Sequence, residues 1–121
     1  NLQDVLLSME DLPSFVGLNN IGVNSVGNFG DTPLHVAVVQ NDLEAIELIV
    51  GAGGDVNAAG EEGYTPLHEA VEQGNDGAAH LLLKLGASVS AKNNSGYTPY
   101  DLAVLLDNGI ASHLLIRHDD V

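Results

Sequence analysis

The chain has no cysteine and no tryptophan, and its 121 residues include only 3 lysines and arginines. Without cysteine there is no disulfide, no thiolate metal site and no cysteine nucleophile, and the redox compartment stays open. No apolar run approaches the roughly 18 residues that a membrane-spanning helix needs. We therefore expect a soluble, cytoplasmic protein. Because the first residue is Asn1 rather than Met, a removed N-terminal targeting segment stays an open alternative.

Basic residues are few against 17 Asp and Glu, so the formal net charge is -14 at pH 7. Residues 1–83 carry 13 of the acids and no Lys or Arg, because Lys84, Lys92 and Arg117 all come later. Nucleic-acid binding depends on cations that neutralise phosphates, so this balance predicts no nucleic-acid partner. It also disfavours an anionic membrane surface. Repulsion between like-charged copies predicts that the free chain is a monomer.

A six-residue segment recurs at a spacing of 33 residues, which indicates a repeat protein. Residues 30–35, 63–68 and 96–101 read GDTPLH, GYTPLH and GYTPYD. The same offset aligns small and apolar residues elsewhere, namely Ala37, Ala70 and Ala103; Ala45, Ala78 and Ala111; Leu48, Leu81 and Leu114; and Val23, Val56 and Val89. So regular a pattern predicts one structural unit built several times.

The residues that recur in this segment are typical of a turn that leads into a helix. Each glycine suits a backbone of positive φ, each threonine suits an N-cap, and each proline suits the first helical position. Turn residues at 41–42 and 74–75 then end this first helix. A second apolar helix follows in each copy, and Gly53 and Gly86 are suited to ending it.

This pattern resembles the ankyrin repeat family, through the TPLH signature at 32–35 and 65–68 and the Gly-Ala and Val-Asn-Ala segments after the second helices. The resemblance covers about residues 20–121 and implies an all-α ankyrin solenoid of about four helix-turn-helix units with short extended hairpin loops. It implies one domain over 1–121, divided into an atypical N-terminal capping repeat (1–29), two repeats (30–62 and 63–95) and a C-terminal capping repeat (96–121). In the N-terminal cap we expect a helix near residues 2–9 and a short, irregular second helix.

Several residues could be taken for catalytic or ligand-binding residues, but a structural role explains them better. His35 and His68 occupy signature positions, and we expect them to hydrogen-bond locally and brace neighbouring repeats. Asp76 and His80 lie four residues apart and could form a surface pair, although no nucleophile is near them in the sequence. The glycines of residues 51–54 are not followed by Lys-Ser or Lys-Thr, so they indicate a helix end rather than a phosphate loop. We expect no catalytic residue, no metal and no cofactor.

The resemblance implies a partner-facing concave surface made from the loop tips and the exposed side of each first helix. Carried over position by position, it predicts these binding residues: Phe29, Asp31, Gln40, Glu61, Glu62, Tyr64, Glu69, Glu72, Gln73 and Tyr97. The middle repeat then presents four glutamates around Tyr64. Glu69 departs from the family, which usually has an apolar residue there.

Tyrosines surrounded by carboxylates predict a module that binds a basic protein. Aromatic side chains supply buried contact, and complementary charge speeds association and rejects wrong partners. Such a module could mask its partner, as an immunity or antitoxin protein masks a nuclease-like toxin. Alternatives are a scaffold or regulatory subunit, an acidity that serves only solubility and, remotely, an enzyme that uses His and Asp across repeats.

Overall fold

The computed structural model describes residues 1–18 and 20–106, and in this part of the chain every regular element is a helix. The elements are α1 (Leu2–Met9), α2 (Pro33–Val39), α3 (Leu43–Gly51), the short 3-10 turn η1 (Glu61–Gly63), α4 (Pro66–Gln73), α5 (Asp76–Lys84) and α6 (Pro99–Leu106). The expected all-α repeat stack is confirmed. The second half of the predicted C-terminal unit, with Arg117, lies outside the described residues.

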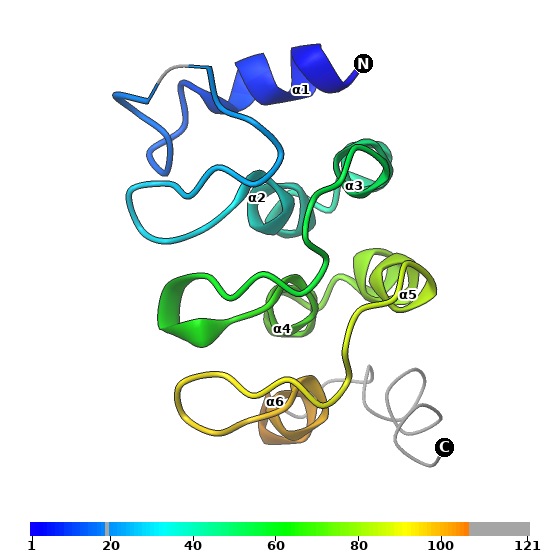
Figure 1. Cartoon of the computed structure of the whole chain (residues 1–121). Coiled ribbons are helices and arrows are strands. Elements are labelled where there is room, and N and C mark those ends of the chain that lie inside the picture. Colours follow the sequence, from blue (N-terminus) through cyan, green and yellow to red (C-terminus); the bar gives the residue numbers. More distant parts are fainter. Residues whose placement is uncertain (19, 107–121) are drawn as a thin grey trace.

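The helices form two columns (Figure 1). The first helices α2, α4 and α6 stand in one column, and α3 and α5 stand beside them, with the loops projecting from the far side of the first column. Within a repeat α2 packs on α3 and α4 on α5, while α2 packs on α4, α4 on α6 and α3 on α5 between repeats. One side of the stack is therefore made of loops and first helices, and the other of second helices.

The first helices begin where the sequence predicts. Pro33, Pro66 and Pro99 are their first residues. The Thr65 hydroxyl accepts a hydrogen bond from the backbone N–H of the fourth residue of the motif, His68, at 3.4 Å. In the last copy, where the motif ends in Asp instead of His, the Thr98 hydroxyl accepts in the same way at 3.1 Å. The hydroxyls of Thr65 and Thr98 thus cap α4 and α6, Thr32 occupies the N-cap of α2 without such a hydrogen bond, and a proline follows in all three helices.

Small residues allow the helices to approach closely. Ala37, Ala70 and Ala103 are fully buried at equivalent positions of the three first helices. Larger apolar side chains, including Ile46 and Leu82 of the second helices, fill the space between the columns and are also fully buried. The core is therefore a continuous strip along the stack, to which each repeat contributes the same positions.

The N-terminal cap is only partly as predicted. Helix α1 covers the expected residues, but residues 10–18 form successive turns instead of a short second helix. Leu12, Phe15 and Leu18 each donate to the carbonyl three residues earlier, at 2.9 to 3.0 Å. Pro13 lacks the backbone N–H that a helix needs, and Gly17 has a φ of +85°, so the chain cannot continue as a helix. The expected second helix was therefore wrong. The fully buried Phe15 side chain of these turns belongs to the hydrophobic core instead.

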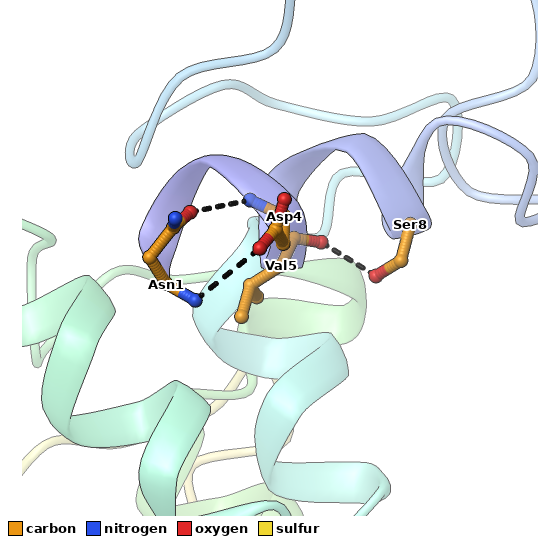
Figure 2. A network of polar contacts seen from close by, with 4 residues as sticks. All are labelled: Asn1, Asp4, Val5 and Ser8. Atoms are coloured by element: carbon orange, nitrogen blue, oxygen red, sulfur yellow. Dashed lines mark hydrogen bonds and ion pairs between the residues drawn. The ribbon is translucent and has the colours of Figure 1, made fainter.

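Polar contacts lie at the start of helix α1 and along it (Figure 2). The Asn1 side chain accepts from the backbone N–H of Asp4 at 3.0 Å, and the N-terminal amine lies 3.5 Å from the Asp4 carboxylate. The Ser8 hydroxyl donates to the Val5 carbonyl at 2.6 Å. The ion pair between the N-terminal amine and Asp4 is exposed, and it is the only one among the described residues. Because exposed pairs stabilise little, packing and hydrogen bonds hold the stack together.

Alanine substitutions at two glycines near the end of α3 should change the stability of the protein in opposite directions. A Cβ on Gly54 would lie 2.6 Å from Ile49 Cγ2 and 2.8 Å from the Ile49 carbonyl oxygen, and Ile49 is fully buried. We expect Gly54→Ala to lower the free energy of unfolding by about 1.5 kcal/mol, because the core must shift. Gly51, inside α3, has open space around it, so Gly51→Ala should raise stability by about 0.5 kcal/mol. Urea unfolding followed by circular dichroism measures both, and a Gly54→Ala variant that is not destabilised would contradict the packing around Ile49.

Candidate functional site

A tight turn in the loop before α4 presents two carboxylates to solvent. Glu61 and Glu62 of η1 are both exposed. Glu62 has a φ of +59°, which is uncommon for a residue other than glycine. Neighbouring loops hold this backbone, because the Asp31 carboxylate accepts from the Glu61 N–H at 3.1 Å and the Glu62 carbonyl accepts from the Asn94 N–H at 3.0 Å. The carboxylates are thus presented by a turn fixed from both sides.

The two signature histidines brace the loops that carry the tyrosines. His68 Nδ1 accepts from the Thr65 N–H at 3.1 Å, so Nε2 carries the proton and donates to the Tyr97 carbonyl at 2.8 Å. His35 Nε2 lies 2.8 Å from the Tyr64 carbonyl in the same arrangement. Burial lowers the pKa of His68, and the hydrogen bond to Tyr97 opposes this only in part. The predicted bracing role is confirmed for both histidines.

The turn, α4 and the next loop enclose a hollow of about 260 Å³. We call it the acidic hollow, and its lining residues are Glu61, Glu62, Tyr64, Glu69, Glu72 and Ser95. The structure therefore brings five of the predicted binding residues together. The Tyr64 ring is half-buried and tilted by 44° against the His68 ring, with 5.5 Å between centroids, so a buried residue supports it.

One carboxylate of the acidic hollow, that of Glu69, is poorly solvated. Burial, together with the charges of Asp31, Glu72 and Glu61, raises the pKa of Glu69 from its ordinary value of 4.5 to about 7. Glu69 is half-buried because it occupies the position that Val36 and Leu102 occupy in the neighbouring first helices.

The pKa of the tyrosine in the hollow is also raised. Burial raises the pKa of Tyr64, and the charge of Glu72 and its hydrogen bond to the phenol raise it further. No Lys or Arg forms an ion pair in residues 1–18 and 20–106, so the described part of the chain supplies no cation to the hollow. A cation entering from outside would meet favourable charge on several sides.

The other predicted residues are spread along the same side of the stack. Asp31 and Gln40 line a second hollow of about 250 Å³ between α2 and the turns of the N-terminal cap, with Val36, Val39 and Leu12. Sequence reasoning missed this hollow, because the cap turns that form it break the 33-residue period. Three predicted residues are exposed but line neither hollow: Phe29, Gln73 and Tyr97.

These features define a class of protein, a helical repeat stack with an extended surface of loops and first helices. The family model for ankyrin repeats, in three copies, matches residues 8–93, and the chain belongs to the ankyrin repeat family. Ankyrin repeats are protein–protein interaction modules. A search of curated proteins finds no match.

Two absences are stated for residues 1–18 and 20–106 alone. None of the helices there is long and apolar enough to cross a membrane. In the same part of the chain, no group of three or more His, Asp or Glu side chains is arranged to hold a metal ion.

Proposed function

We propose that this chain is a non-catalytic module that binds a basic protein, with a Lys or Arg side chain of the partner in the acidic hollow. The observation that carries the proposal is the enclosure of Tyr64 by four glutamates, with no Lys or Arg among the lining residues in the part of the chain that the structure describes. A bound cation would relieve the repulsion between Glu69 and its neighbours, and it could stack on the phenol ring. The surrounding carboxylates would speed the encounter.

Masking is the mode of action that follows from this proposal. A strongly acidic surface that covers a cationic groove would exclude the nucleic acid or other anion that the groove binds. An immunity or antitoxin protein acting on a nuclease-like toxin in the cytoplasm is one such use, by analogy alone. If the bound partner keeps its own activity, the module serves instead as a scaffold or regulatory subunit.

The binding surface can be tested with a fluorescent arginine-rich peptide as the probe. We expect the peptide to bind, and Glu61→Lys/Glu62→Lys to weaken binding about tenfold by removing steering charge. Tyr64→Ala should weaken it by a similar factor through lost contact. Fluorescence anisotropy at low and at physiological ionic strength measures both effects.

A matched control separates the hollow from net charge. Asp4→Lys/Glu44→Lys changes the net charge equally at two exposed acids of α1 and α3, and it should weaken binding much less. If both double variants weaken binding equally, the peptide responds to overall charge and the proposed site is wrong. Co-expression with a basic toxin then tests masking, since a masking module would restore growth and a scaffold would not.

A further inference from the structure

The second helices form a groove that the proposed function does not use. It lies between α3 and α5, which stand side by side away from the loops (Figure 1), and its volume is about 520 Å³. Leu43, Gly77 and Leu81 give it an apolar lining, and the Leu43 side chain is 41% exposed. Gly77 keeps the groove open, because a Cβ there would already touch the Leu43 methyl groups at 3.6 and 3.7 Å. An exposed leucine that lines an apolar groove is suited to packing against a helix of another molecule.

The charged residues along α5 form a self-complementary series. Asp76, His80 and Lys84 all line the groove and are spaced by four residues, so they follow one face of the helix from its start to its end. The sequence suggested a local pair between Asp76 and His80, but these exposed side chains form no ion pair in the described part of the chain. If a second α5 lies antiparallel with the two His80 residues level, Asp76 of each copy meets Lys84 of the other.

The other rim of the groove supports the same arrangement. Glu47 of α3 also lines it, and its position in the repeat is that of His80, 33 residues later. It therefore faces the level at which His80 of a second copy would lie. The groove combines two acids with one lysine and one histidine, so it is close to neutral in a chain of net charge -14.

We propose that the α3/α5 groove is the interface of a symmetric dimer, in which α5 of each copy lies antiparallel in the groove of the other. Two-fold symmetry makes each contact occur twice, so two Asp76–Lys84 pairs would flank the leucines. At physiological salt the Debye length is about 8 Å, which screens the distant acids of two copies but not groups in contact. The dimer leaves the acidic hollow free and does not depend on the proposed function.

The test compares the mass of the 121-residue chain with that of two charge-reversal variants, by sedimentation velocity over a range of concentrations. We expect the wild type to pass from monomer to dimer. Asp76→Lys sets lysine against Lys84 of the other copy, and Lys84→Asp sets aspartate against Asp76, so each variant alone should dimerise at least about tenfold more weakly. An equal mixture of the two variants should dimerise again, because every pair is then attractive.

Two controls show whether a loss of dimerisation is due to the groove. Circular dichroism checks that both variants are folded, and Glu44→Lys, an exposed change on α3 outside the groove, should leave the dimer intact. A wild type that stays monomeric at every concentration, as its net charge alone predicts, would overturn the proposal. So would a dimer that resists both substitutions, or a mixture of the variants that fails to dimerise.

Discussion

Replacing His68 by alanine should lower the free energy of unfolding by roughly 3 kcal/mol, the largest effect that we expect from a single substitution. The imidazole is fully buried and joins two repeats, since it accepts from Thr65 and donates to the Tyr97 carbonyl at 2.8 Å. Alanine would leave the carbonyl and the N–H without these partners and would open a cavity. In a domain whose total stability is on the order of 10 kcal/mol, such a loss is severe.

Urea unfolding of dilute protein, followed by circular dichroism, measures this loss. His80→Ala is the matched control, because His80 is exposed on α5, and its effect should stay within about 0.5 kcal/mol. His35→Ala should behave like His68→Ala, since His35 contacts the Tyr64 carbonyl in the same way. A loss below about 1 kcal/mol for His68→Ala would show that the hydrogen bond between repeats contributes little.

Glu69→Gln should stabilise the protein at about pH 8 by about 2 kcal/mol and leave it nearly unchanged at about pH 4. In the folded chain the pKa of Glu69 is raised from 4.5 to about 7, mainly by burial. Between these two values the folded protein holds a proton that the unfolded chain has released. Stability from this group is therefore complete below pH 4.5 and is lost as the pH rises to 7. The expected size allows for the partial exposure of Glu69, which lets solvent screen the charge.

The comparison must be made between variant and wild type at each pH. Burial lowers the pKa of His68, so protonation of the unfolded chain destabilises the fold as the pH falls below 6.5 and partly hides the effect of Glu69. Glu44→Gln removes one exposed carboxylate from α3 and is the matched control for the loss of one negative charge. If Glu69→Gln gives the same stability difference at both pH values, Glu69 does not hold a proton in the folded protein.

The helix starts and the contacts of the histidines with the threonines could be predicted from the sequence because they depend on local rules. Threonine is favoured at an N-cap and proline at the first helical position, and a histidine three residues after that threonine can reach back to its backbone. The 33-residue period then placed these features in equivalent positions of a stack. The cap turns at residues 10–18 fell outside the period, so the second helix that we expected there does not form.

The sequence by itself determined the repeat, the starts of the first helices and the identity of the acidic residues around Tyr64. The tertiary structure decided how those residues meet: Glu69 is half-buried beside three other carboxylates, and Glu47 shares a groove with Lys84. The physical reason is distance along the chain. Local hydrogen bonds join residues three or four apart, whereas the charge of Asp31 beside Glu69 and the position of Glu47 beside Lys84 depend on residues about one repeat apart that only stacking brings together.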